Sequence, residues 1–245
     1  MELNCKYGSI GDNPMPILEN IQINIDLEAA RRRLHLKRES DLKALQDLAA
    51  VAQPLIEPKV LYKICYIEEK LAEGVIVEGL NLSSKVLRKN LDKIERIFPF
   101  VITIGSKFSE RLDACSDLLE KFYLDVVGNV ALNQVRLELK NHLRAEYAIE
   151  KTAFMAPGSL PDWPIDEQKP LFKLLGDVES AIGVKLTESL LMLPAKSVSG
   201  IYFPTESTFF SCQLCPREQC DSRKAKYDEK LAKEYGIKEQ DKAER

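Results

Sequence analysis

Apolar residues recur at helical spacing near the start of the chain and predict two packed helices there. The first covers residues 27–34 and begins behind Asp26, whose carboxylate is a good N-cap. The second starts at Ser40 or Asp41 and ends before Pro54, because proline removes a backbone donor and fixes the chain. We therefore expect this part of the chain to be helical.

The next segments change from helical spacing to short runs of β-branched and aromatic residues. Residues 60–67 and 75–77 predict two strands, and the run FVITIG at 100–105 predicts a short buried strand. Between them, Ser83 or Ser84 can cap an amphipathic helix that continues through Leu91 and Ile94.

The second half begins with a long apolar pattern over residues 109–147 that predicts one or two core helices. Gly128 inside this pattern indicates close packing against a neighbour. The segment 156–164 is rich in proline and glycine and predicts an ordered loop. A helix is then expected from Asp166 to Gly183, with the glycine as its stop.

Two further strands, 186–193 and 197–203, predict a hairpin around Pro194. Helices early and late, with strands interspersed and no strict βαβ alternation, favour an α+β fold. We expect an N-terminal segment at residues 1–24, an α+β domain at 25–210 and a charged, cysteine-containing tail at 211–245.

Composition narrows the class of protein. The chain has 245 residues, of which 45% are hydrophobic, and a formal net charge of -3, so it has enough apolar residues for a core and no clustered positive charge for nucleic acid. No apolar run is long enough to span a membrane, and the start lacks an export signal, so we expect a cytoplasmic protein. The common phosphate-loop, serine-nucleophile and zinc-protease motifs are absent.

One run carries a family signature. LTESLLMLPAKSVSGIYF at 186–203, preceded by Pro157 and Gly158 and by the helix LFKLLGDVESAIGV, resembles the activation domain of cobalamin-dependent methionine synthase. The likeness extends loosely over residues 25–223, and the chain also resembles stand-alone bacterial members of that family, which end in a CxxCxxxxC tail. It implies a twisted antiparallel sheet flanked by helices.

The resemblance also implies a function. Activation domains bind S-adenosylmethionine over a corrinoid and couple one-electron reduction of cob(II)alamin to its remethylation. Because this sequence has no DxHxxG pattern, the corrinoid is expected on a separate methyltransferase, with an electron-donor protein as a possible further partner. The positions that match the family's cofactor-binding residues, or correspond to them, are Pro157, Gly158, Ser159, Glu188, Ser197, Ser199, Gly200 and Tyr202.

Two positions depart from the family motif R-x-x-P-G-Y. Phe154 stands where the motif has arginine, and Ser159 stands where it has tyrosine. Loss of the guanidinium removes a charge-assisted partner for the ligand's carboxylate. An alternative is therefore a non-catalytic cap or cofactor-handling module for corrinoid proteins that has lost S-adenosylmethionine binding. The polar positions can equally satisfy backbone groups of the hairpin.

The segment CQLCPREQC places Cys212, Cys215 and Cys220 close together in sequence. Thiolates at i and i+3 can converge on one metal, and a third can reach it around the loop. An iron-sulfur cluster would supply an electron, whereas zinc would only fold the tail. The fourth ligand stays open, and three unligated thiols are the alternative. Cys65 and Cys115, like the isolated Cys5, are expected to be small buried apolar residues.

Overall fold

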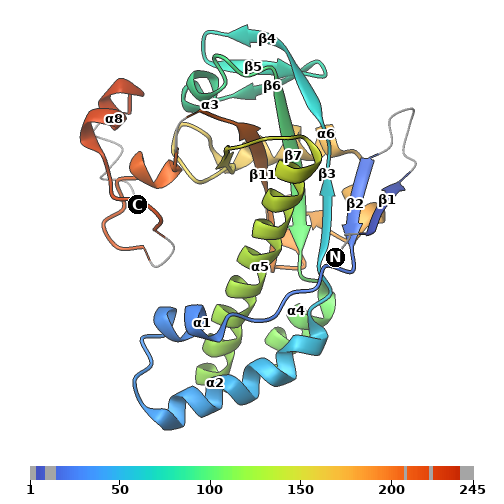
Figure 1. Cartoon of the computed structure of the whole chain (residues 1–245), viewed down its shortest axis with the longest axis vertical. Coiled ribbons are helices and arrows are strands. Elements are labelled where there is room, and N and C mark those ends of the chain that lie inside the picture. The colour runs from blue at the N-terminus through green and yellow to red at the C-terminus, as the bar shows by residue number, and fades with distance from the viewer. Residues whose placement is uncertain (1–3, 9–14, 207–208, 221–222, 238–245) are drawn as a thin grey trace. The chain divides into compact units, whose positions relative to one another are not determined.

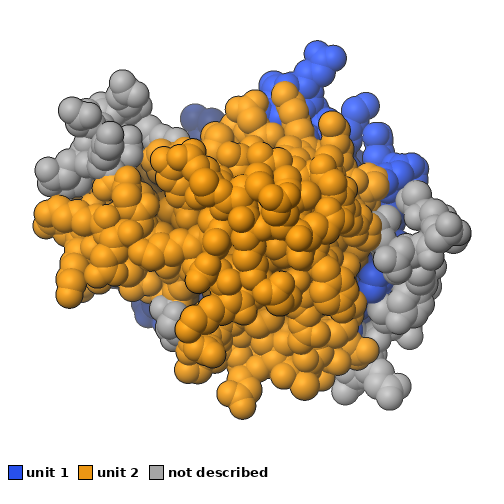
Figure 2. All heavy atoms as spheres, turned by 90° about the horizontal axis from the view of Figure 1, so that it is seen from above, with its two compact units in different colours: residues 1–61, 101–142, 177–198 blue, residues 62–100, 143–176, 199–245 orange. Residues whose placement is uncertain are grey.

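The computed structural model describes residues 4–8, 15–206, 209–220 and 223–237. Contacts between residues divide the chain into two units, coloured separately in Figure 2. Unit 1 comprises residues 1–61, 101–142 and 177–198, and unit 2 comprises the remainder. Cys5 lies in a strand, but its side chain is outside the described part of the chain, so its burial stays a prediction.

Unit 1 contains the two predicted N-terminal helices, α1 (Leu27–Arg33) and α2 (Glu39–Ala52), labelled in Figure 1. Asp26 is the N-cap of α1 and accepts the Ala29 N–H at 2.9 Å, which confirms the predicted start. The predicted cap of α2 is wrong by two or three residues. Arg38 occupies the N-cap without a side-chain hydrogen bond, and the acidic first turn favours the helix instead.

Strands and a long helix complete unit 1. β1 (Asn4–Gly8) pairs antiparallel with β2 (Met15–Glu19), and β2 pairs with β3 (Lys59–Tyr62). The predicted helical pattern at 109–147 is two helices, α4 (Ser106–Asp113) and α5 (Leu118–Glu146). A Cβ at Gly128 would lie 2.6 Å from the Phe108 ring, so the predicted close packing is confirmed.

Unit 2 is built around antiparallel strands. β4 (Cys65–Leu71), β5 (Gly74–Val77) and β6 (Leu80–Ser83) lie side by side, and β4 also pairs with the first residues of β7 (Arg96–Thr103) (Figure 1). β8 (Thr152–Met155) pairs antiparallel with β11 (Ser197–Pro204). One apolar cluster fills the unit and includes the fully buried Trp163.

The helix predicted from Asp166 to Gly183 is interrupted. A short 3₁₀ turn, Ile165–Glu167, leads into α6 (Gln168–Leu175), and Gly176 at φ +68° ends that helix. Asp177 then caps α7 (Val178–Ile182), and Gly183 in the left-handed region ends it as predicted. The predicted start at Asp166 is wrong, because Glu167 holds the N-cap position of α6 without a side-chain hydrogen bond. An Asx cap, Asp177, directly after Gly176 was the signal for the break.

The predicted hairpin of residues 186–193 and 197–203 is also corrected. Among the described residues, the strand partners of the first run are its own ends, β9 (Lys185–Leu186) and β10 (Met192–Leu193), which pair antiparallel around a turn. Its Leu191 and Leu193 are exposed, so the run has no buried face to specify a longer strand.

The C-terminal tail folds onto unit 2. A 3₁₀ turn, Ser211–Gln213, and α8 (Glu229–Glu234) place Leu214 and Ala232 in the core of that unit. The predicted α+β class, an antiparallel sheet with helices, is confirmed. Among the described residues, no helix has the length and apolar character needed to cross a membrane.

Candidate functional site

β8 pairs with β11, and this pairing brings two predicted cofactor-binding residues, Gly200 and Tyr202, next to Phe154. Phe154 stands where the family motif has arginine. Tyr202 is the cross-strand partner of Phe154. A Cβ on Gly200 would lie 2.6 Å from both the Met155 carbonyl oxygen and the Phe154 ring. Glycine is therefore required at position 200 because the two strands approach so closely.

An aromatic cluster occupies this part of unit 2. The ring of Phe100 stacks on Tyr202 with centroids 5.1 Å apart, and Phe154 lies 5.8 Å from Phe100 and 5.5 Å from Tyr202. Tyr202 is buried, and Phe154 is only partly exposed. The family's arginine is thus replaced by a packed ring, which offers stacking in place of a guanidinium.

The loop that follows β8 is held by its own backbone. Gly158 has φ +78° and donates its N–H to the Trp163 carbonyl at 2.7 Å. The Ser159 hydroxyl donates to the Ala156 carbonyl at 2.6 Å, and Pro157 is buried. The Ser159 side chain is therefore engaged in closing the turn. The predicted ordered loop is confirmed.

Trp163 and Asp162 anchor this loop to the rest of unit 2. Trp163 is fully buried and its indole N–H donates to Glu167 at 3.4 Å. Asp162 accepts the Ser84 hydroxyl, the Lys85 N–H at 3.2 Å and the Val86 N–H at 2.9 Å. Sequence reasoning gave Asp162 no role, because a carboxylate that caps a helix 76 residues away leaves no local signal.

Two predicted cofactor-binding residues belong to unit 1. In the sequence, Glu188 precedes β10 and Ser197 follows it. Glu188 is exposed in the turn Thr187–Leu191, and among the described residues its carboxylate has no partner. Ser197 is buried and donates its hydroxyl to the Pro194 carbonyl at 2.7 Å. The turn itself is closed by Thr187, which accepts the Leu191 N–H at 3.0 Å.

A buried lysine that the sequence reading passed over fixes the start of β11. The Lys196 ammonium lies 2.6 Å from Asp125 and 2.8 Å from the Asn129 amide oxygen, both on α5. Its carbonyl accepts the Ile104 N–H at 3.2 Å. This lysine therefore sets the backbone position of Ser197 from two sides. The i, i+4 spacing of Asp125 and Asn129 was the signal available in the sequence.

Ser199, in unit 2, differs from the other predicted hydroxyls. It is 2% exposed and its Oγ has no hydrogen-bond partner among the described residues. Buried hydroxyls nearly always have one, so Ser199 is an exception close to the β8–β11 pair. Thr152 and Gln168 of unit 2 likewise each have a buried oxygen without a partner among the described residues.

The cysteine segment forms a loop closed by an arginine. Arg223 donates to the carbonyls of Cys212 at 3.2 Å and Ala225 at 3.4 Å, and also to that of Arg217. The Lys224 N–H points at the Cys212 sulfur at 3.4 Å. Cys212 and Cys215 are partly buried, and Cys220 is exposed.

The thiols are not arranged as a finished metal site. Within the described ranges, no group of three or more His, Cys, Asp or Glu side chains is placed to hold a metal ion. Cys65 and Cys115 are buried, as predicted. Burial is the main cause that raises the pKa of the Cys65 thiol to about 12, with a further contribution from Glu78.

Comparison with known proteins tests the predicted family signature and the fold. Residues 133–227 match the family model described as vitamin B12 dependent methionine synthase, activation domain. The fold is similar to a crystal structure of the MetH reactivation domain bound to AdoHcy, at 17% identity and a TM-score of 0.59. The match covers 79% of this chain and 80% of that chain. The predicted resemblance to the activation domain is thereby confirmed, while the likeness to the stand-alone form with a cysteine tail and the metal at the cysteine segment stay predictions.

Proposed function

We propose that this chain supports reductive remethylation of a corrinoid carried by a separate methyltransferase such as methionine synthase. The observation that carries the proposal is the family match over residues 133–227 together with the shared fold. The matched range includes the loop after β8, the signature segment and the cysteine segment.

The proposed small ligand is S-adenosylmethionine, whose sulfonium would supply the methyl group. Support comes from the neighbouring structure, which is described as bound to AdoHcy. Among the described residues of unit 2, the buried Ser199 hydroxyl lacks a hydrogen-bond partner. A hydroxyl group fits a ligand that itself carries hydroxyls. The ligand's carboxylate has no guanidinium at Phe154.

In this proposal, Gly158 and Pro157 offer backbone groups to the ligand, and Ser199 donates to it. The aromatic cluster of Phe100, Phe154 and Tyr202 keeps water from the neighbouring strands. Lys196 acts through Ser197 by holding the start of β11.

Calorimetry of the full chain with S-adenosylmethionine and AdoHcy tests this ligand. We expect weak binding, because the charge-assisted carboxylate partner is missing. Phe154→Arg restores the motif's guanidinium and should tighten binding by roughly tenfold or more. Phe154→Leu is the matched control, since it removes the ring without adding a donor. If neither the native chain nor Phe154→Arg releases or absorbs heat at millimolar ligand, this ligand is excluded.

A second candidate function rests on the same two departures. Phe154 fills the arginine position with a packed ring, and Ser159 turns its hydroxyl onto the Ala156 carbonyl. A cap that covers a protein-bound corrinoid without S-adenosylmethionine accounts for both. It predicts that the chain binds a corrinoid methyltransferase equally well with and without S-adenosylmethionine, as measured by sedimentation.

We also propose that Cys212, Cys215 and Cys220 bind an iron-sulfur cluster or zinc once their loop tightens. Support comes from the spacing and from the Lys224 N–H directed at the Cys212 sulfur, a contact that a metal-bound sulfur can keep. Anaerobic purification with metal analysis and an absorption spectrum decides the case. We expect about one bound centre per chain and its loss in Cys215→Ser, while Cys115→Ser keeps it. Colourless, metal-free protein would refute the site.

A further inference from the structure

Helix α3 (Lys85–Asn90) presents a row of basic side chains on its outer face. Val86, Leu87 and Leu91 are buried in unit 2, so the residues between them face outward. Lys85, Arg88 and Lys89 lie on that outer face, and Lys93 follows in the turn after the helix. The helix N-terminus is already satisfied by Ser84 and Asp162, so the positive character of this face comes from side chains.

These basic side chains line a hollow of about 640 Å³. Leu71 and Ala72, from the end of β4, and Ile94 supply apolar surface, and Thr205 with Glu206 closes one side. Small-molecule sites usually occupy about 300 to 1,000 Å³ and combine apolar walls with a few charged groups. The size and lining of this hollow match that description.

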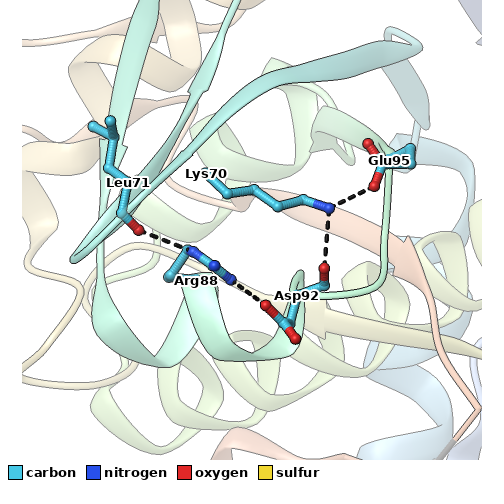
Figure 3. A network of polar contacts seen from close by, with 5 residues as sticks. All are labelled: Lys70, Leu71, Arg88, Asp92 and Glu95. Carbon is cyan, nitrogen blue, oxygen red and sulfur yellow. Dashed lines mark hydrogen bonds and ion pairs between the residues drawn. The ribbon is translucent and has the colours of Figure 1, made fainter.

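The rim of the hollow is held in place before any ligand arrives. Arg88 donates to the Leu71 carbonyl at 2.9 Å and to Asp92 at 2.8 Å (Figure 3). The Lys70 ammonium bridges the Asp92 carbonyl at 3.0 Å and the Glu95 carboxylate at 2.5 Å. The turn after α3 is therefore tied to β4, and binding need not order it.

The lining carries excess positive charge. It contains four cations and two carboxylates, those of Asp92 and Glu206. Asp92 is matched by Arg88, and Lys85 pairs with Glu73 outside the lining. Lys89 contacts the Glu234 carbonyl at 2.8 Å and the Tyr235 ring, neither of which carries a negative charge.

Lys93 has no hydrogen bond or ion pair within the described part of the chain. Its charge contributes, after Arg88, to lowering the pKa of the Asp92 carboxyl group. Lys89 lies in the last turn of α3 and Lys93 in the turn that follows, and both line the hollow. Two ammonium groups without carboxylate partners suit a phosphate monoester, which carries about -1.5 to -2 near neutral pH, better than a single carboxylate.

We propose that this hollow binds a small organic phosphate. Lys89 and Lys93 hold the phosphate, and the organic part lies against Leu71 and Ile94. The site does not depend on the function proposed above, and its ligand is distinct from S-adenosylmethionine, which has no phosphate.

Calorimetry of the full chain with adenosine 5'-monophosphate, adenosine and inorganic phosphate tests the proposal. We expect the monophosphate to bind, adenosine not to bind, and inorganic phosphate to bind more weakly than the monophosphate. Lys93→Gln should weaken binding of the monophosphate by about tenfold or more, because a charge-assisted contact is lost. Lys89→Gln should act in the same direction.

Lys169→Gln is the matched control, since Lys169 is an exposed lysine of unit 2 outside the hollow. Thermal unfolding checks that each variant is folded, and Lys93→Gln removes no hydrogen bond or ion pair of the described residues. Equal weakening by Lys169→Gln and Lys93→Gln, or no binding of either phosphate probe, would overturn the site. Equal affinity for inorganic phosphate and the monophosphate would overturn the organic part. Saturating S-adenosylmethionine should leave binding of the monophosphate unchanged.

Discussion

Cys65 illustrates how burial sets the chemistry of a single residue. Its thiol is 1% exposed and contacts Glu78 at 3.5 Å. Burial raises its pKa from 9.0 to about 12, so the thiol stays protonated in the folded chain at neutral pH. The thiolate is the reactive form, and we therefore expect Cys65 to resist alkylation while the exposed Cys220 reacts. Peptide mapping after brief iodoacetamide treatment at pH 8, with and without denaturant, checks this. Labelling of Cys65 in the native chain at the rate of Cys220 would contradict it.

The same shift predicts a pH dependence of stability. Above pH 9 the unfolded chain ionises this thiol while the folded chain keeps the proton. Because the unfolded state then binds fewer protons, the free energy of unfolding falls as pH rises from about 9 to about 12. Urea unfolding across this range should show a shallower decline in Cys65→Ala than in the native chain. Parallel declines would mean that Cys65 contributes nothing to the slope.

At the scale of elements, Asp162 joins the proline-rich loop to α3. Its carboxylate accepts a hydroxyl and two backbone N–H groups at the start of that helix. Asp162→Ala should lower the free energy of unfolding by about 2 to 4 kcal/mol, because it leaves the buried Ser84 hydroxyl and the helix N-terminus without their acceptor. Asp166→Ala is the control. Asp166 is exposed and pairs with Lys169 at the long distance of 3.8 Å, so this substitution should lower the free energy of unfolding by less than about 0.5 kcal/mol. Chemical unfolding compares the two, and equal losses would refute the anchoring role.

Gly200 lies where β11 closely approaches the backbone of β8. A Cβ there would lie 2.6 Å from the Met155 carbonyl oxygen, which belongs to the backbone of β8. Gly200→Ala should therefore destabilise the chain by about 1 to 3 kcal/mol. Shortening the neighbouring ring in the double variant Gly200→Ala with Phe154→Ala should not restore stability, because the backbone clash remains. Full recovery of the melting temperature in the double variant, relative to Phe154→Ala alone, would assign the clash to the ring.

For the whole molecule, local signals in the sequence predicted most elements but not their long-range partners. Asp26 marked its helix because a cap acts within three residues. The break at Gly176 and Asp177 was missed, although both residues are local signals, because the apolar spacing continued across it. The signature predicts which residues form the candidate site, whereas the Ser199 hydroxyl without a partner among the described residues and the Lys196 contacts depend on tertiary packing. No sequence pattern separates a buried hydroxyl with a partner from one without.

Each of the two proposed ligands should also raise the free energy of unfolding of the chain, by more when its affinity is higher. A ligand that binds only the folded chain adds about 2.7 kcal/mol at a concentration one hundred times its dissociation constant. For a chain of this length that corresponds to an increase of roughly 5 to 11 °C in melting temperature. S-adenosylmethionine should reach this increase at lower concentration with Phe154→Arg than with the native chain, whereas adenosine 5'-monophosphate should be indifferent to position 154 and sensitive to Lys93→Gln. Scanning calorimetry with each ligand separates the two sites. If Phe154→Arg and Lys93→Gln alter the response to both ligands alike, the two proposals describe a single site and the hollow beside α3 is not independent.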